Sequence, residues 1–319
     1  MPSTPRRIIG VDIAKEKIDI HDLQQEKHRI VLAADYSKWV ESLAQDKPDL
    51  IVMEASGGYQ RDLVTLLAAA GIPFTVLNPR RVRDYAKSIG HFAKTDKIDA
   101  RVIARYAEVN NLQPQPPPDA SVAALRDLVA RRRQLVEFHK AERNREQQAR
   151  HPRVKKDIAA TLKFLEKQIA KLEQDMDHEI KNTPSWHETE KLLVSVPGVG
   201  QTTARALIAE MPELGQLNRQ KIAYLAGLAP LNDDSGKHSG QRHIQGGRAS
   251  VRNALYMATV SATRHNPYIR EFFQRLRNGE KAKKYKVALT ACMRKMLLLL
   301  NSLVKTQKPF SMEVAGGTV

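Results

Sequence analysis

Short apolar runs alternate with amphipathic stretches over the first hundred residues of this 319-residue chain. Runs bounded by turn residues predict strands, and apolar positions recurring every three or four residues predict helices. The predicted elements are, in order, strands at 7–13, 17–23 and 27–32, a helix at 36–44, a strand at 50–54, a helix at 60–70, a strand at 73–77, and helices at 80–88 and 97–110. A three-stranded meander followed by alternating helix and strand is the order of an RNase H-like α/β domain. In that order the first and fourth strands are neighbours.

A proline-rich stretch at 113–118 ends this pattern, because successive prolines cannot continue a helix or pair in a sheet. We therefore predict an RNase H-like domain at 1–118. Two charged helical stretches follow, at 123–150 and 155–180, and the second carries apolar residues at alternating four- and three-residue steps. These patterns predict a coiled-coil helical hairpin at 119–182 that contacts a partner chain. A solvated hairpin without a partner is the alternative.

The last predicted domain, 183–319, is mainly helical. It opens with a helix, the turn Pro-Gly-Val-Gly at 197–200 and a second helix, which together resemble a helix-hairpin-helix motif. Gly198 and Gly200 would let backbone N–H groups approach a phosphate at the positive end of the second helix. A glycine-rich turn between two packed helices would give the same pattern.

The charge of the chain favours a polyanionic partner. It has 52 Lys and Arg against 35 Asp and Glu, a formal net charge of +17. The surplus is concentrated between residues 231 and 310, with 16 basic against 4 acidic residues. Membrane attachment is disfavoured because the longest aliphatic run, 296–300, is far shorter than a span. With no signal peptide and the single cysteine Cys292, we expect a cytoplasmic protein without an internal disulfide.

Four acids stand where a two-metal site needs them. Asp12 and Glu54 close the first and fourth predicted strands, and Asp96 and Asp99 are three residues apart on a helix. Carboxylates converging from separate elements can hold two Mg²⁺ ions that clamp a phosphodiester. Lys94 and Lys97, beside the acids, would hold the scissile phosphate. The alternative is that such an acid, Asp99 above all, merely pairs with a neighbouring cation on a solvated face.

Two basic segments are candidate nucleic-acid contacts. One is the predicted helix with Arg80, Arg81, Arg83 and Lys87, which could clamp a nucleic-acid backbone or form a solvated face. The other is a glycine-rich segment that we predict to be a flexible loop. Its candidate residues, together with the arginine that follows it, are Ser235, Lys237, Ser239, Arg242, Arg248 and Arg252.

A serine in this loop could attack phosphorus and conserve the bond energy in a phosphoserine ester. The blander interpretation is that its cations grip phosphate while its serines only form hydrogen bonds. Zinc binding by His238 and His243 is less favoured, because two histidines without cysteine make an incomplete ligand set.

Several of these motifs occur in one order along nearly the whole chain. They are Val11-Asp12, Met53-Glu-Ala-Ser-Gly-Gly-Tyr59, Asn78-Pro79, Lys94-Thr-Asp-Lys-Ile-Asp-Ala100, Val196-Pro-Gly-Val-Gly200, and Ser235-Gly-x-x-x-Gly-x-x-x-Ile-x-x-Gly247. In this the chain resembles the DEDD insertion-sequence transposases, which are bridge-RNA-guided recombinases. The resemblance implies a RuvC-like domain, a coiled coil and a C-terminal transposase domain.

The resemblance also implies roles for single residues. The metal-binding acids of the family match Asp12, Glu54, Asp96 and Asp99, and its nucleophilic serine matches Ser235. Ser239 also precedes a glycine, so only the spacing to Ile244 and Gly247 distinguishes the two serines. The implied reaction is Mg²⁺-dependent cleavage and exchange of donor and target DNA strands through a 5′-phosphoserine link and a Holliday junction.

The implied assembly includes a structured guide RNA. It also includes an oligomer, a dimer that assembles to a tetramer, in which the acids of one subunit meet the serine of another. Three other functions remain open at this stage. They are a junction resolvase or nuclease that uses metal-activated water, a noncatalytic nucleic-acid scaffold, and, least favoured, a sugar kinase that shares the opening Gly-x-Asp strand.

Overall fold

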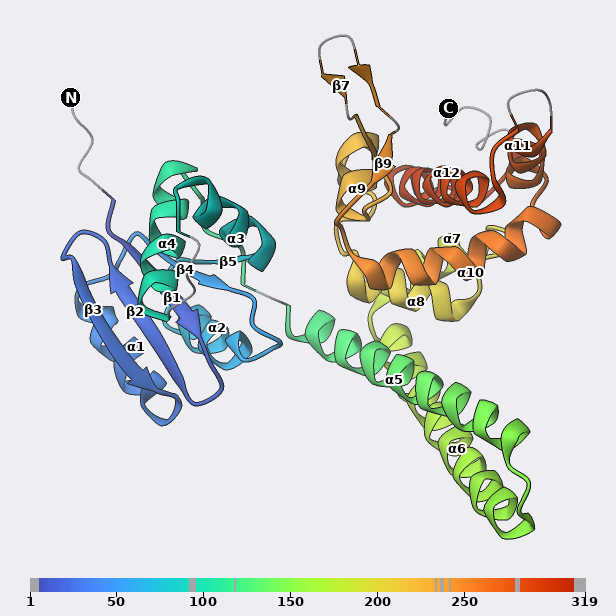
Figure 1. Ribbon diagram of the computed structural model, residues 1–319, viewed down its shortest axis with the longest axis horizontal. Helices are drawn as coiled ribbons and strands as arrows, with labels where there is room; N and C mark the ends of the chain where they lie inside the picture. Colours follow the sequence, from blue (N-terminus) through green and yellow to red (C-terminus); the bar gives the residue numbers. More distant parts are fainter. Residues whose placement is uncertain are drawn as a thin grey trace. The chain divides into compact units, whose positions relative to one another are not determined.

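The computed structural model describes residues 6–91, 96–117, 119–232, 234–235, 238–240, 242–278 and 282–312, with backbone alone at 96–98, 234–235 and 238–239. The chain divides into two compact units, Met1–Pro118 and Asp119–Val319, and each is described by itself (Figure 1). A further division of the second unit into hairpin and C-terminal domains stays a prediction.

The first unit is a five-stranded sheet with helices on both faces. Its elements are β1 (Ile8–Ile13), β2 (Lys17–Asp22), β3 (Lys27–Leu32), a 3₁₀ turn (Ala33–Asp35), α1 (Tyr36–Gln45), β4 (Leu50–Glu54), α2 (Gln60–Ala69), β5 (Phe74–Leu77), α3 (Pro79–Ser88) and α4 (Asp96–Val109). The strand order is β3-β2-β1-β4-β5, with β1–β2 and β2–β3 antiparallel and β1–β4 and β4–β5 parallel. This mixed sheet is consistent with the predicted RNase H-like fold, and the predicted pairing of the first and fourth strands is confirmed.

Alternation along β1 divides the core of this unit between two faces, because successive strand residues point to opposite sides. Ile9, Val11 and Ile13 pack with apolar residues of α1 and α2. On the opposite face, Ile8 packs with residues of α3 and α4, and Leu50 and Val52 of β4 join it there. Even-numbered positions of β1 and β4 therefore face α3 and α4.

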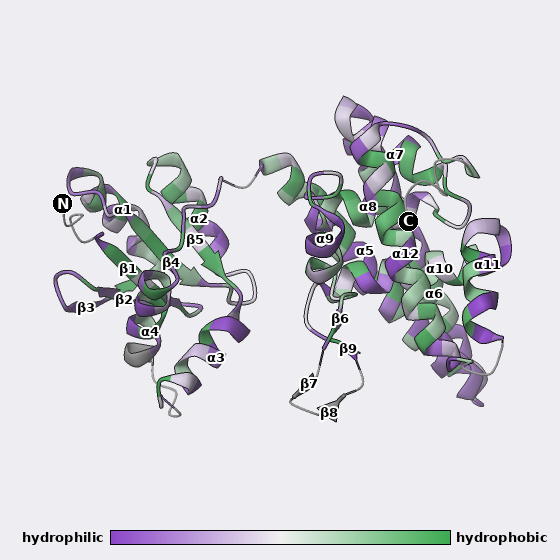
Figure 2. Cartoon of the chain, turned by 90° about the horizontal axis from the view of Figure 1, so that it is seen from above, coloured by the Kyte–Doolittle hydropathy of each residue, from purple (hydrophilic) through white to green (hydrophobic). Residues whose placement is uncertain are grey.

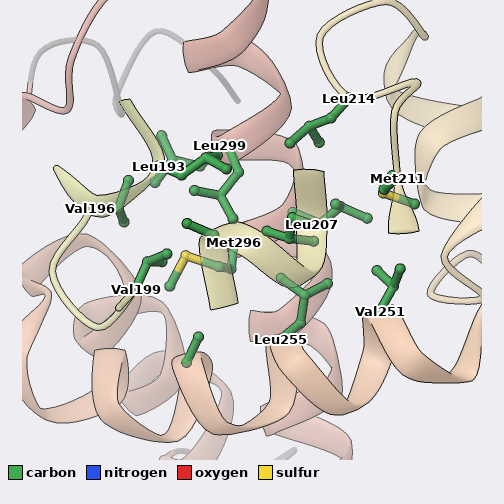
Figure 3. Close-up of a cluster of buried hydrophobic side chains, with 14 of the residues drawn as sticks. Leu193, Val196, Val199, Leu207, Met211, Leu214, Val251, Leu255, Met296 and Leu299 are labelled. Carbon is green, nitrogen blue, oxygen red and sulfur yellow. The ribbon is translucent and has the colours of Figure 1, made fainter. Parts of the chain in front are cut away.

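The second unit is mainly helical. Its elements are α5 (Ala120–Gln148), α6 (Pro152–Asn182), α7 (Pro184–Val194), α8 (Gln201–Glu210), α9 (Arg219–Leu225), β6 (Pro230–Leu231), β7 (Asp234–Ser235), β8 (His238–Ser239), β9 (His243–Ile244), α10 (Ala249–His265), α11 (Pro267–Arg277) and α12 (Tyr285–Thr306). One apolar core joins α7, α8, α10 and α12 (Figure 3), and Leu125 of α5 and Met176 of α6 belong to it as well.

The helices α5 and α6 form an antiparallel pair. Arg132 on α5 donates two hydrogen bonds to Glu173 on α6, at 2.8 and 2.6 Å, and His139 lies 3.1 Å from Glu166. The apolar seam of α6 is buried or half-buried along its length. Arg132 and His139, two polar residues on the face of α5 that packs against α6, thus contact acidic residues of α6. Coiled-coil geometry and a partner chain stay predictions.

The helix α12 is long and apolar enough to cross a membrane by length and composition, and 56% of its apolar window is buried inside the protein. Burial raises the pKa of Cys292, near the middle of α12, to about 12. Both observations describe a core helix, in which Cys292 is a small buried apolar residue.

Candidate active site

Asp12 and Glu54 lie side by side at one edge of the sheet. The parallel register of β1 and β4 pairs Gly10 with Val52 and Val11 with Met53, so Asp12 and Glu54 occupy the next position along each strand. Both have even numbers and so share the face that α3 and α4 cover. Both side chains are half-buried, as expected where strands leave the core.

The helix α4 crosses this face antiparallel to β1 and in close contact with it. A Cβ atom on Gly10 would lie 2.1 Å from the carbonyl oxygen of Ala100, so the absence of a side chain allows the approach. Beyond the end of α4, Asn111 accepts a hydrogen bond from Arg6, the residue two positions before β1, at 3.0 Å. The C-terminal end of α4 therefore lies near the start of β1, and its N-terminal end lies near Asp12.

This register brings the start of α4 to the level of Asp12. From Ala100 to Asp96 is about one helical turn, and from Gly10 to Asp12 is two strand residues, distances of about 6 Å in each case. Asp99 is half-buried next to Ala100. The fold thus brings the backbone positions of all four predicted acids to one end of the sheet.

A metal-binding geometry is not observed directly. Among the side chains that the structure describes, no three His, Cys, Asp or Glu residues gather closely enough to hold a metal ion. The side chain of Asp96 and that of the adjacent Lys97 lie outside those described, and Lys94 lies outside the described residues altogether. The four-acid site therefore stays a prediction.

Asp19 is an acid at this edge that the sequence analysis missed. It pairs with Asp12 across β1 and β2, and cross-strand partners share a face. Only 4% of Asp19 is exposed, and its carboxylate contacts Lys17 at 2.9 Å and His28 at 3.1 Å. The register of the first two strands could have indicated it. These two contacts stabilise a buried carboxylate beside Asp12.

The basic residues predicted on α3 are all exposed. Val82 and Ala86 turn inward, and Arg80, Arg81, Arg83 and Lys87 lie on the outer face. Arg80 makes a long contact of 3.7 Å with Asp84. These side chains are positioned to meet a polyanion, and their role as a nucleic-acid clamp stays a prediction.

The segment predicted as a flexible loop is instead a β-ribbon. At its base, β6 pairs with β9, matching Pro230 with Ile244. Beyond this ladder, β7 pairs with β8, matching Ser235 with His238 and Asp234 with Ser239 (Figure 2). The prediction was wrong because glycine composition does not reveal backbone pairing between short strands. Arg242 is exposed on the ribbon, and Lys237 lies outside the described residues.

The base of the ribbon is held by a contact between two backbones. Gly227 and Gly247 both have φ near +70°, and a Cβ atom on Gly247 would lie 2.1 Å from the nitrogen of Gly227. Arg252 donates hydrogen bonds to the carbonyl oxygens of Gly246, at 2.5 Å, and Ala226, at 3.1 Å. Glycine at both positions therefore lets the returning strand lie directly on the end of α9.

Arg248 secures the same base from the other side. It forms a bidentate pair with Glu213, both hydrogen bonds measuring 2.6 Å, and donates to the carbonyl oxygen of Glu210 at 2.8 Å. Burial alone would raise the pKa of Glu213, but its hydrogen bonds and the charge of Arg248 outweigh burial and lower it. Arg248 and Arg252, predicted as nucleic-acid contacts, thus have structural partners within the chain.

The two glycines of the α7–α8 turn differ in their surroundings. A Cβ atom on Gly198, where φ is +100°, would lie 2.7 Å from the backbone nitrogen of Ala262 in α10. Gly200 is exposed, has open space around it and is the N-cap of α8. Packing accounts for Gly198, and the open helix end lies at Gly200. A helix-hairpin-helix function stays a prediction.

Comparison with known proteins identifies the relatives of this chain. Residues 9–151 match a transposase family whose name combines DEDD and IS110, and residues 190–274 match the transposase IS116/IS110/IS902 family. The chain belongs to the IS110 family of transposases. The predicted membership among insertion-sequence transposases is confirmed, and the chain is accordingly a DNA recombinase or transposase.

Individual relatives of this IS110-family transposase support the same assignment. The pilin gene-inverting protein of Moraxella bovis is 28% identical over 96% of this chain and 98% of its own length. The transposase for insertion sequence element IS1111A of Coxiella burnetii is 24% identical over 72% of this chain and 70% of its own. Family membership implies DNA substrates and indicates dependence on a divalent metal.

Proposed function

We propose that this IS110-family transposase cleaves and exchanges DNA strands through a 5′-phosphoserine link on Ser235, with Mg²⁺ held by Asp12, Glu54, Asp96 and Asp99. The observation that carries the proposal is the shared edge of β1, β4 and α4. The register of β1 with β4 and the close contact of α4 with β1 support the proposal, because they bring the backbone positions of the four acids toward one end of the sheet.

The donor set fits the metal. Oxygen ligands are those that Mg²⁺ prefers, and carboxylates from a sheet edge and a helix start can converge from different directions. Bound there, Mg²⁺ would stabilise negative charge on the attacking and leaving oxygens of a phosphodiester. Lys94 and Lys97 would bind the scissile phosphate, and the exposed cations of α3 would hold the flanking backbone.

The serine step conserves a phosphoester bond. The hydroxyl oxygen of Ser235 forms a bond to phosphorus, the bond from phosphorus to the 3′ oxygen breaks, and the serine proton ends on that oxygen. A 3′ hydroxyl of another strand then attacks the phosphoserine, which restores the Ser235 hydroxyl. The ribbon base, fixed by Arg248 and Arg252, would hold this strand pair in a defined direction.

The test compares two serines on one ribbon. A plasmid that carries the element with its flanks is incubated with full-length protein, its copurified RNA and Mg²⁺, and covalent protein–DNA species are separated under denaturing conditions. We expect the adduct with wild type and Ser239→Ala, and none with Ser235→Ala or Asp12→Asn. An adduct lost only in Ser239→Ala would move the nucleophile to Ser239.

Two outcomes would favour other functions. Normal metal-dependent cleavage by Ser235→Ala, with no covalent species from wild type, would indicate a nuclease or resolvase that uses water. Unchanged DNA products from Asp12→Ala and Asp96→Ala would indicate a scaffold. Either result contradicts the serine mechanism.

A guide RNA and an oligomer complete the proposal. The exposed basic face of α3, Arg242 and the open N-terminus of α8 at Gly200 offer binding groups for a structured RNA as well as for donor and target DNA. On the hairpin, Phe138 and Phe164 are 55% and 60% exposed, which suits contact with another subunit in a dimer or tetramer. We place the enzyme in the cytoplasm, where its DNA is. Sequencing the copurified RNA tests guidance, and a heterogeneous background of cellular RNA would contradict it.

A further inference from the structure

A large cleft in the first unit plays no part in the proposed chemistry. It has a volume of about 930 Å³ and lies between the β2–β3 hairpin, α4 and the end of α3. Its lining includes the side chains of His21, Glu26, His28, His91, Arg101 and Arg105. Lys27 adds a further cation, and Glu26 is the one acid among the described residues of its lining. The lining is therefore strongly basic.

The sheet register explains how these groups converge. His21 pairs with Gly10 on one side and with His28 on the other, so both histidines face α4. Arg101 and Arg105 are four residues apart on α4 and so share one side of that helix. Figure 1 shows α4 lying across β1 and β2. Three regular elements, β2, β3 and α4, thus hold four basic or imidazole groups around one space.

The carboxylate of Glu26 lies among these groups without a close partner among them. Its oxygens are 3.5 Å from Nε2 of His21, 3.6 Å from a guanidinium nitrogen of Arg101 and 3.8 Å from one of Arg105. All three distances exceed those of ordinary charge-assisted hydrogen bonds. Glu26 is a turn residue with φ of +48°, and its side chain is 54% exposed. An exposed turn can move this carboxylate away.

A second observation indicates a missing ligand. His21 is only 5% exposed, yet its Nε2 atom forms no hydrogen bond with any residue that the structure describes. A buried polar atom without a hydrogen bond is costly and rare. Burial, opposed by Glu26, lowers the pKa of this imidazole. An anion that accepts a hydrogen bond in the cleft would satisfy it.

We propose that this cleft binds a backbone phosphate of a nucleic acid, which displaces the Glu26 carboxylate and takes contacts from His21, Arg101 and Arg105. The proposal rests on the proposed function only in taking a nucleic acid as the partner. A phosphate suits the site because two guanidinium groups and a neutral imidazole can donate to several oxygens at once.

The outer wall of the cleft connects it to the basic face of α3. Tyr85 and Ile89, at the end of α3, line the cleft, and Lys87 lies exposed between them in sequence. A nucleic-acid backbone bound along Arg81, Arg83 and Lys87 would reach the cleft with its next phosphates. The cleft would therefore extend the predicted nucleic-acid clamp of α3, with Arg101 and Arg105 of α4 binding the last phosphate of the bound segment.

The test measures binding of full-length protein in EDTA, so that no metal-dependent step contributes. Probes are a duplex DNA, a single-stranded DNA and an RNA hairpin, each fluorescently labelled, at several salt concentrations. Arg101→Ala and Arg105→Ala should each weaken binding about three- to tenfold and lower the salt slope by about one. Glu26→Gln should strengthen binding by a similar factor, because it removes the competing charge. The probe with the largest changes identifies the nucleic acid.

Matched controls lie on the other face of the sheet. Arg29 on β3 pairs with Ile20, which belongs to the opposite core, and Glu41 is exposed on α1. Arg29→Ala and Glu41→Gln make the same charge changes away from the cleft. Melting curves of all variants exclude unfolding as the cause, and Arg105→Lys should retain most of the affinity because the cation stays.

The result that overturns the proposal is equally clear. If Glu26→Gln fails to strengthen binding and the two arginine variants match Arg29→Ala on every probe, the cleft is not a phosphate site. That failure would leave adduct formation by Ser235 untouched. Conversely, loss of the serine mechanism would not alter binding measured in EDTA.

Discussion

The acid-bearing edge of the sheet and the serine ribbon are positioned in opposite ways. Asp12, Glu54 and the start of α4 are set by a continuous strand register and by one close helix–strand contact. Ser235 lies on a strand of two residues beyond the base of the ribbon, and the braces found among the described residues lie at that base. The first site is fixed by the core of its unit, and the described supports of the second are the arginines and glycines at the base of the ribbon. Substitutions that act on one kind of support should not resemble those that act on the other.

The largest effect is expected at the acid edge itself. Asp12→Asn removes one charge of the proposed metal site and keeps the side-chain shape, so strand cleavage should fall by about 10³-fold or more while the fold persists. Cleavage of the plasmid substrate and the melting temperature are measured together. Cleavage within a few-fold of wild type would remove Asp12 from the metal site.

Substitution of Gly10 tests whether the close contact between β1 and α4 positions the acids. A methyl group there would meet the Ala100 carbonyl at 2.1 Å and the Ala104 nitrogen at 2.7 Å, and backbone atoms cannot move aside. Gly10→Ala should destabilise the first unit by about 2–4 kcal/mol and reduce cleavage, because α4 must shift. Trp39 reports on this unit in a Trp186→Phe background, since these are the only two tryptophans.

Gly200→Ala is the control for this variant, because Gly200 has open space and an ordinary φ of −95°. It should cost less than about 1 kcal/mol in the second unit. If Gly10→Ala is equally mild, the contact of α4 with β1 does not set the position of the acids.

Most of the first unit could be predicted because its sequence is locally consistent. Apolar alternation and turn residues located every strand within one residue, and the strand order made Asp12 and Glu54 neighbours. Gly10 and Asp19 escaped notice for a physical reason. The role of Gly10 depends on a helix ninety residues later, and Asp19 matters only through its cross-strand partner.

The ribbon was harder to predict, because the roles of its residues depend on contacts with residues distant in the sequence. Four glycines suggested a loop, but Gly247 is required where two backbones meet at the end of α9. Arg248 and Arg252 looked like ligands for phosphate, and the structure pairs them with Glu213 and with carbonyl oxygens. Positive charge near a predicted nucleophile therefore does not by itself indicate a substrate contact.

Arg248 and Arg81 sharpen this distinction. Arg248→Ala should destabilise the second unit by about 1–2 kcal/mol, since the pair with Glu213 is bidentate but about one third exposed. Arg81→Ala should change stability by less than about 0.5 kcal/mol and weaken DNA binding about three- to tenfold. Urea unfolding followed by Trp186 in a Trp39→Phe background, with binding measured in parallel, separates the two. Equal losses of stability in the two variants would contradict the assignment of a structural role to Arg248 and a binding role to Arg81.

The smallest effect is the pH dependence of this brace. The folded-state pKa of Glu213 lies below its ordinary value of 4.5, so its pair with Arg248 contributes stability that is fully present above that value and is lost as pH falls through the folded-state pKa. The gap in unfolding free energy between wild type and Arg248→Ala should stay constant from pH 8 to about 5.5 and narrow below the ordinary glutamate pKa. Below the folded-state pKa of Glu213 both proteins carry a protonated Glu213, and the guanidinium loses its anionic partner. A gap that stays unchanged down to the pH at which Glu213 is protonated in the folded protein would mean that Arg248 braces the ribbon through the Glu210 carbonyl alone.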